Sequence, residues 1–256
     1  MNLPRPVLLP YFTAGWPTPE AFLEAVCGAA EAGCPAFEVG IPFSDPVADG
    51  PIIQQTSKQA LDQGISWGRA LELTARATRA AGIPAIAMTY CNPVVTRGLS
   101  QAMGELASAG VEGLIIPDLT LEEGEPFEQA AELAGLKLIY LVAPTTPDDR
   151  IQELARRTRG FLYLVAVRGV TGARAELPED LHSLIERAVA RSPVPVLVGF
   201  GISRPEQAAR VCASAHGIIV GSALLQQLQG STAEDARERS RRYLSSLSEA
   251  MRPTRC

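Results

Sequence analysis

Short apolar runs alternate with longer amphipathic segments along the whole chain, and this alternation limits the choice of fold more than any other feature. Strands are expected at the apolar runs 7–13, 36–41, 85–90, 113–117, 137–143, 161–167, 194–200 and 217–220. Helices are expected where apolar residues recur three and four positions apart, at 19–32, 66–81, 99–109, 121–134, 147–158, 178–191, 204–213 and 233–251. Alternating strands and helices are typical of a parallel sheet covered by helices.

The number of strand–helix pairs distinguishes a closed barrel from an open sheet. Eight pairs in 256 residues fit a (β/α)8 barrel, which typically takes about 250 residues. An open dinucleotide-binding sheet has little support, because no Gly-x-Gly-x-x-Gly motif follows the first strand. No linker or change of composition divides the chain. We therefore expect one α/β domain, a single (β/α)8 TIM barrel over residues 1–256.

Charge and composition exclude several classes of protein. The net charge of −5 argues against binding to nucleic acid or to an anionic membrane surface. No apolar run approaches the roughly 18 residues of a membrane span, and the first residues lack the apolar stretch of a secretion signal. The five cysteines have no metal-binding spacing, and neither do His182 and His216. We expect a cytoplasmic protein without a metal site.

Glu38 is the most unusual polar residue near a strand end, which is where the reacting groups of a (β/α)8 barrel stand. The segment 35–41 around it otherwise has the composition of a buried strand. Burial disfavours the charged carboxylate and raises its pKa, which makes a glutamate a proton donor near neutral pH. The alternative is a structural glutamate paired with an arginine.

Asp49 lies eleven residues after Glu38, in a segment whose flanking prolines and Gly50 indicate a fixed loop. We expect a long loop over 42–56 that returns over the barrel mouth and brings this second carboxylate to the first. Two carboxyl groups in different surroundings could then divide the acid and base work. Alternatively, Asp49 is a turn or helix-capping residue.

Glycine clusters follow the last three predicted strands, at 169–172, 199–201 and 221–222. Barrel enzymes often bind phosphate with the loops after strands seven and eight and a helix N-terminus. Because no lysine stands in these clusters, backbone N–H groups would supply most of the binding. We interpret the clusters as a phosphate site. The alternative is that these glycines serve only tight turns.

Several segments, in order along nearly the whole chain, carry a family resemblance. The most specific is Glu38-Val39-Gly40-Ile41-Pro42-Phe43-Ser44-Asp45-Pro46 with Ala48-Asp49-Gly50-Pro51; the others are Leu9 to Gly15, Met88 to Pro93, Pro117 to Leu119, Ala143 to Thr145, Gly169 to Gly172, Gly199 to Ile202 and Gly221 to Ala223. Together they closely resemble the tryptophan synthase alpha subunit family.

This resemblance implies cleavage of indole-3-glycerol phosphate to indole and glyceraldehyde 3-phosphate, a retro-aldol reaction of tryptophan biosynthesis that needs no cofactor in this subunit. Glu38 matches the family's catalytic glutamate, which shuttles protons between C3 of the indole and the hydroxyl beside the breaking bond. Asp49 matches the second carboxylate, which accepts the indole N1–H and balances positive charge on the ring.

The residues that the resemblance places against substrate divide by the part of the substrate they contact. The indole is walled by Tyr11, Tyr90, Phe200 and the apolar strand ends, and Tyr163 lies beside the glycerol and the catalytic carboxylate. Thr171 belongs to the loop that closes over substrate, and the phosphate site is Gly172, Gly201, Gly221 and Ser222.

Family members pass indole to a pyridoxal-phosphate-dependent beta subunit in an α2β2 complex, and Asp45 is expected among the contacts to that partner. Two other functions stay open. The short segment Met1 to Pro6 before the first strand permits a standalone indole-3-glycerol-phosphate lyase. The second open function is that of a catalytically weak subunit that activates a beta partner, although the presence of both Glu38 and Asp49 argues against it.

Overall fold

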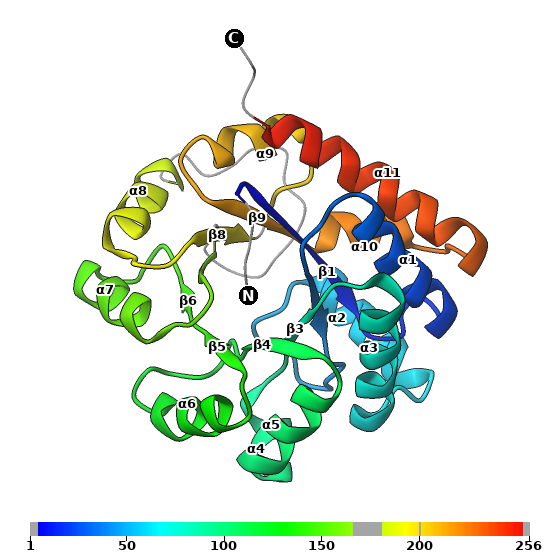
Figure 1. The fold of residues 1–256 in the computed structure, drawn as a ribbon, viewed down its shortest axis with the longest axis horizontal. Helices are drawn as coiled ribbons and strands as arrows, with labels where there is room; N and C mark the ends of the chain where they lie inside the picture. The colour runs from blue at the N-terminus through cyan, green and yellow to red at the C-terminus, as the bar shows by residue number, and fades with distance from the viewer. Residues whose placement is uncertain (1–4, 166–180, 200, 253–256) are drawn as a thin grey trace.

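Nine parallel strands form one sheet in the computed structural model, which describes residues 5–165, 181–199 and 201–252. The strands are β1 (Val7–Thr13), β2 (Phe37–Gly40), β3 (Ala85–Met88), β4 (Val111–Ile115), β5 (Lys137–Ile139), β6 (Leu141–Val142), β7 (Leu162–Val165), β8 (Val196–Gly199) and β9 (Gly217–Val220). Their order in the sheet is β5-β4-β3-β2-β1-β9-β8-β7-β6. The first and last strands of the chain therefore pair, and the sheet curls into a nearly closed barrel (Figure 1).

Helices surround this barrel on the outside (Figure 1). They are α1 (Pro19–Glu31), α2 (Pro51–Asp62), α3 (Trp67–Ala81), α4 (Cys91–Arg97), α5 (Leu99–Ser108), α6 (Gly124–Leu133), α7 (Asp148–Arg157), α8 (Leu181–Arg191), α9 (Pro205–Cys212), α10 (Ser222–Leu228) and α11 (Ala233–Met251). All seven residues of β1 are buried, as expected for a strand covered on both faces. Phe12 on β1 makes edge-to-face contacts with Phe22 on α1 and Phe37 on β2, each with ring centroids 6.3 Å apart.

The predicted fifth strand, 137–143, is two strands that break at Tyr140. The Tyr140 N–H donates to the hydroxyl of Thr158 at 3.0 Å instead of joining a strand ladder, because that buried hydroxyl lies beside it. Its carbonyl oxygen accepts from the N–H of Tyr163 at 3.0 Å. As a result β5 pairs with β4 and β6 pairs with β7, so this divided strand lies where the two ends of the sheet meet.

Three described helices that the sequence analysis did not predict, α2, α4 and α10, follow the carboxyl ends of β2, β3 and β9. The expected long loop over 42–56 is wrong in its second half, because α2 begins at Pro51 with Gly50 as its N-cap. Proline suits the first turn of a helix, where its missing N–H has no partner to lose. Ile53, Thr56 and Ala60 form the buried face of α2 at three- and four-residue spacing.

The first and last helices close the outer layer against each other. A Cβ atom added at Gly28 on α1 would lie 2.2 Å from the carbonyl oxygen of Arg237 on α11, so the two backbones approach there as only glycine allows. At the edge of this contact the Arg237 guanidinium donates to Glu24 at 2.6 Å. The α1–α11 contact thus joins the two ends of the described chain.

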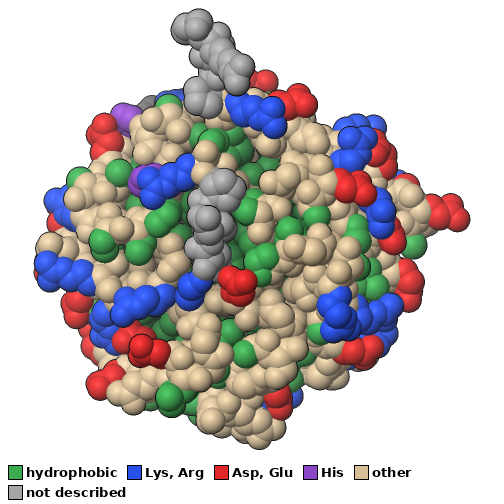
Figure 2. All heavy atoms as spheres, in the orientation of Figure 1, with side chains coloured by type: hydrophobic (Ala, Val, Ile, Leu, Met, Phe, Trp, Pro, Cys, Tyr) green, Lys and Arg blue, Asp and Glu red, His purple; other side chains and the backbone are tan. Residues whose placement is uncertain are grey.

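The surface carries charges of both signs. Figure 2 shows basic and acidic side chains interspersed around the rim of one face. Among the described residues, no helix has both the length and the apolar character needed to cross a membrane.

Candidate active site

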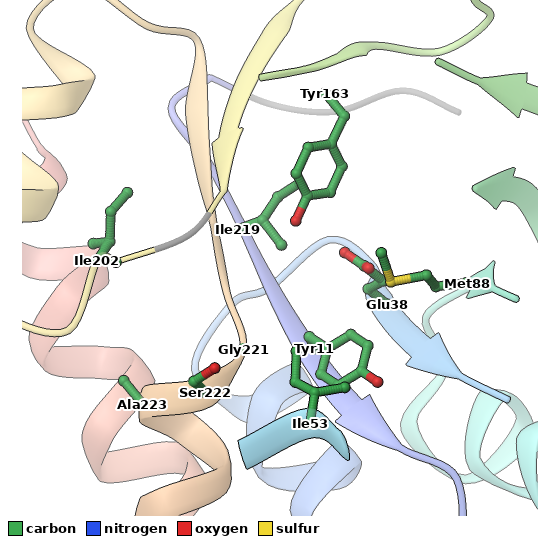
Figure 3. Close-up of a pocket in the computed structure, with 11 residues that line it drawn as sticks. Tyr11, Glu38, Ile53, Met88, Tyr163, Ile202, Ile219, Gly221, Ser222 and Ala223 are labelled. Atoms are coloured by element: carbon green, nitrogen blue, oxygen red, sulfur yellow. The ribbon is translucent and has the colours of Figure 1, made fainter. Parts of the chain in front are cut away.

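A cavity lies at the carboxyl end of the barrel, beside the predicted catalytic glutamate. Its lining is Tyr11, Glu38, Ile53, Met88, Tyr163, Gly201, Ile202, Ile219, Gly221, Ser222 and Ala223. Figure 3 shows Glu38, Tyr11 and Tyr163 projecting toward this space from β2, β1 and β7. Because all the strands are parallel, side chains near their carboxyl ends meet at one end of the barrel.

Glu38 is held inside the barrel by the register of its strand. It pairs with Tyr11 on β1 and Ile86 on β3, and only 1% of it is exposed. Its Oε2 has no hydrogen-bond partner among the described residues, and Glu38 forms no ion pair with any of them. The structure therefore gives no support to a structural pairing with arginine. Burial, and then the charge of Asp49, raise the pKa of Glu38 to about 8. The carboxyl group is therefore protonated at neutral pH and can donate.

Asp49 lies between β2 and α2 and is also buried. The Tyr90 hydroxyl donates to its Oδ2 at 2.9 Å, whereas its Oδ1 has no partner among the described residues. Burial raises the pKa of Asp49 to about 6, and the hydrogen bond from Tyr90 limits the rise because it favours the charged form. At pH 7 this carboxyl group is therefore mostly ionised, in contrast to Glu38.

Asp49 does not cap the helix that follows it, because the N-cap of α2 is Gly50 and no side chain caps that helix. Backbone contacts fix the segment around it instead. The Asp49 N–H donates to the Pro46 carbonyl at 3.0 Å, and the Gln54 side chain donates to the Asp49 carbonyl at 2.8 Å. Gln54 was not predicted, because nothing in the local sequence distinguishes it from other polar helix residues.

Tyr11 and Tyr163 line the cavity, each beside a glycine of the neighbouring strand. A Cβ atom at Gly40 would lie 2.0 Å from the Tyr11 hydroxyl, and one at Gly199 would lie 2.4 Å from the Tyr163 hydroxyl. Only glycine at these two strand ends leaves room for the tyrosine side chains. Burial raises the pKa of both phenols well above the usual range, so they stay neutral.

Tyr90 is not among the residues that line the cavity. It is the N-cap residue of α4, its hydroxyl contacts Asp49, and its ring lies 5.5 Å from that of Phe43. The structure thus places Tyr90 against a carboxylate of the site. Whether it also walls the indole stays a prediction.

Of the predicted phosphate-binding residues, Gly201, Gly221 and Ser222 line the cavity. Figure 3 shows Gly221 and Ser222 across this space from Glu38. Gly201 has a φ of 85°, a left-handed conformation that favours glycine. Predicted residues Thr171, Gly172 and Phe200 lie outside the described residues. The sequence indicates that apolar strand ends wall the indole but names none of the apolar lining residues, because an apolar side chain at a strand end or on a helix carries no signal that separates it from the core. These residues are Ile53, Met88, Ile202, Ile219 and Ala223.

Two further expectations concern the surface and metals. Asp45 is exposed on the segment between β2 and α2, close in the chain to Val47, which is 73% exposed. In the part of the chain that the structure describes, no cluster of three or more histidine, cysteine, aspartate or glutamate side chains could hold a metal ion.

The model of one protein family, described as tryptophan synthase alpha chain, matches residues 2–252. The chain belongs to this family. The tryptophan synthase alpha chain of Dehalococcoides mccartyi is 45% identical over 225 residues, which are 88% of this chain and 88% of that one. That of Chloroflexus aurantiacus is 43% identical over 249 residues, 96% of this chain and 93% of that one.

Solved structures of tryptophan synthases share the fold. A chain of Mycobacterium tuberculosis tryptophan synthase superposes with a TM-score of 0.88 at 36% identity, over 98% of this chain and 94% of that one. A chain of the Pyrococcus furiosus tryptophan synthase complex superposes with a TM-score of 0.89 at 32% identity, over 97% of this chain and 100% of that one. The predicted (β/α)8 barrel is confirmed. As a member of the tryptophan synthase alpha chain family, the chain is a lyase that cleaves indole-3-glycerol phosphate, as the resemblance implied.

Proposed function

We propose that the cavity at the carboxyl end of the barrel cleaves indole-3-glycerol phosphate, with Glu38 as the proton shuttle and Asp49 as the partner of the indole nitrogen. One observation carries this assignment. Glu38 lines the cavity, and Asp49, whose charge acts on it, does not; their pKa values lie on opposite sides of neutral, at about 8 and about 6. Environments that separate two pKa values in this way assign the acid and the anion of a mechanism.

Glu38 begins as the acid. It gives its proton to C3 of the indole ring, and the C2=C3 electrons form the new C–H bond. The resulting carboxylate then takes the proton of the hydroxyl on the carbon attached to C3. The bond between that carbon and C3 breaks, its electrons restore the C2=C3 bond, and an aldehyde forms. Glu38 ends protonated, so one residue serves both steps.

Asp49 acts on the charge that this protonation creates. Protonation at C3 leaves a cationic C=N bond at the ring nitrogen. Asp49 Oδ1, which has no partner among the described residues, accepts the N1–H, and the negative charge stabilises the cation in surroundings that exclude water. Every electron of the broken bond returns to the ring and every proton to Glu38, so the reaction balances without a metal or an organic cofactor.

Binding follows from the lining of the cavity. Tyr11 and Tyr163 with the apolar strand ends would enclose the indole and the glycerol, and Gly201, Gly221 and Ser222 would hold the phosphate through backbone N–H groups and the serine hydroxyl. Thr171, Gly172 and Phe200 are assigned to the closing loop, the phosphate site and the indole wall by the family resemblance alone.

We further propose a pyridoxal-phosphate-dependent beta subunit as the partner, in an α2β2 complex. A similar chain comes from a structure described as the tryptophan synthase α2β2 complex of Pyrococcus furiosus. The exposed Asp45 and Val47 lie on the same segment as Asp49, so a protein docked there would lie close to the site of cleavage. We place the chain in the reducing cytoplasm, in keeping with the free thiols of its four described cysteines.

Product analysis tests this function. The purified chain is incubated with indole-3-glycerol phosphate and excess EDTA, with and without a beta subunit, and indole and glyceraldehyde 3-phosphate are measured. We expect equal amounts of both products and faster release with the beta subunit. Fast turnover alone with no beta binding would favour a standalone lyase. Beta activation without any cleavage would favour a catalytically weak subunit and would contradict the roles given to Glu38 and Asp49.

A further inference from the structure

We propose that Tyr90 is a positioning residue, whose hydroxyl holds the Asp49 carboxylate in line for the indole nitrogen although its ring does not line the cavity. The inference deepens the proposed function and rests on the role given there to Asp49. It assigns to Tyr90 a role in the chemistry of the site in addition to any contact with the indole.

The hydrogen bonds of the Tyr90 hydroxyl fix the direction of its proton. The hydroxyl accepts from the N–H of Ala48 at 3.1 Å and lies 2.9 Å from Asp49 Oδ2. A phenol has a single hydrogen, and a backbone N–H can only donate. The hydrogen of Tyr90 is therefore left for Asp49, and a hydrogen bond to a carboxylate is about twice as strong as one between neutral groups.

Tyr90 is itself held by segments that follow two other strands. The N–H of the next residue, Cys91, donates to Asp118 Oδ1 at 2.9 Å, which satisfies the first turn of α4 from the segment after β4. The ring of Phe43, from the segment after β2, lies 5.5 Å from the Tyr90 ring. The hydroxyl therefore occupies a fixed point relative to β2, β3 and β4.

The two oxygens of Asp49 therefore have different surroundings. Tyr90 binds Oδ2, and Oδ1 has no partner among the described residues. A carboxylate held by one oxygen cannot rotate freely, so the other oxygen keeps a single direction. A direction that is fixed in advance lowers the reorganisation needed when a ring N–H binds to this oxygen.

Tyr90 also affects the ionisation of Asp49. The groups that interact electrostatically with Asp49 are Glu38 on β2, Tyr11 on β1, Tyr90 after β3 and Tyr163 on β7. Among them Tyr90 donates a hydrogen bond that lowers the pKa of Asp49, against the rise that burial causes. Removal of the hydroxyl is therefore expected to raise the pKa of Asp49 above about 6 and to leave less of the ionised form at pH 7.

The test is Tyr90→Phe, which keeps the ring and its contact with Phe43 and removes only the hydroxyl. We expect kcat to fall roughly 10- to 100-fold, the range of a lost hydrogen bond to a charged group, with KM changed less than about threefold. The acid limb of the pH profile of kcat/KM should move to higher pH. Substrate is the same in both proteins, so ionisation of its phosphate, with a pKa of about 6, contributes equally.

Tyr140→Phe is the matched control. The Tyr140 hydroxyl also donates to a carboxylate at 2.6 Å, but that carboxylate belongs to Glu128 on α6, which has no role in the proposed reaction. Its removal should leave kcat and the acid limb unchanged. A double variant adds a second readout, because Tyr90→Phe should cause little further loss in the Asp49→Asn background if its effect passes through Asp49.

Three results would overturn the proposal: wild-type kcat in Tyr90→Phe, a reduced kcat with an unmoved acid limb, or a full additional loss in the Asp49→Asn background. These outcomes leave the proposed function intact. If instead Asp49→Asn alone retained full activity, the role of Asp49 would fail, and the role of Tyr90 would fail with it.

Discussion

Glu38 occupies a position in which its charged form is unfavourable, and this links its proposed use as an acid to the stability of the fold. It is buried among strands that are otherwise apolar, and its Oε2 has no partner among the described residues. In the folded chain its pKa is about 8, against 4.5 for an unperturbed glutamate. Between these two values the folded chain holds a proton that the unfolded chain has released. Its contribution to stability therefore falls as pH rises through this window.

Glu38→Gln should for this reason become more stable relative to the wild type as pH rises. The amide does not titrate, so the difference in unfolding free energy should grow by about 2–4 kcal/mol between pH 5 and pH 8. Urea unfolding at both values measures it. Glu132→Gln, at an exposed position of α6, is the control for the loss of one carboxylate charge. The same pH dependence in Glu38→Gln and the wild type would mean that Glu38 does not titrate in this range.

Asp49→Asn tests the second carboxylate. The amide cannot balance a cationic ring, and kcat should fall roughly 10²- to 10³-fold, as when one group that stabilises transition-state charge is removed. The loss should persist across the pH range, because no titration restores the charge. Turnover measured from pH 5 to pH 9 checks this. Activity close to that of the wild type at any of these values would make Asp49 a loop residue only.

How much of the site the sequence predicts depends on how far apart the interacting residues are in the chain. Glu38 is recognisable because one charge interrupts an apolar strand. The hydrogen bond between Tyr90 and Asp49 joins residues 41 positions apart, and no local pattern encodes it. The role of Tyr90 therefore becomes visible only when β2 and β3 are placed side by side.

The strands and helices also divide into those that a local sequence pattern predicts and those that it does not. The bounds of β1 and β9 agree with the sequence prediction, because each apolar run ends at a clear change in composition. Helices α2, α4 and α10 were missed because prolines, glycines and short length favour an interpretation as loops. The break at Tyr140 depends on the hydroxyl of Thr158, a contact across 18 positions of the chain.

Glycine-to-alanine changes at the α1–α11 contact and at an exposed helix position should have opposite effects on stability. Gly28→Ala would place Cβ 2.2 Å from a backbone oxygen of α11, and such overpacking typically destabilises by about 1–3 kcal/mol. Gly104→Ala on the exposed face of α5 has no atom within 4 Å of its new Cβ and should stabilise by about 0.5–1 kcal/mol. Thermal unfolding compares the two. Equal effects would show that α1 and α11 do not meet at Gly28.

At the scale of the whole molecule, the segment that we propose to face the partner also carries a residue that we propose for the chemistry. The residues between β2 and α2 carry the exposed Asp45 and Val47 and the buried Asp49. Indole is apolar and would diffuse away from an open cavity, so a partner docked over this end could both receive the product and respond to the occupied site.

Asp45→Ala tests this arrangement. Its carboxylate is exposed and has no part in bond cleavage, so the isolated chain should keep its basal turnover within about twofold, whereas stimulation by a beta subunit should fall roughly 10-fold, the effect of losing about 1.4 kcal/mol of contact energy. Turnover with increasing beta subunit, together with calorimetric titration, provides the measurement. Glu132→Ala, near the C-terminal end of α6, is the surface control. Undiminished stimulation in Asp45→Ala would move the interface elsewhere.

The most direct test of the central claim is the turnover of indole-3-glycerol phosphate by Glu38→Gln. The amide keeps the size of the side chain and can neither give the proton to C3 nor take it from the hydroxyl. Loss of a positioned acid or base typically lowers the rate by about 10²- to 10⁴-fold, and here both proton transfers are lost together. We expect kcat to fall by at least 100-fold while substrate still binds with an affinity within a few-fold of the wild type. A Glu38→Gln variant that retained more than about a tenth of wild-type turnover would contradict the mechanism.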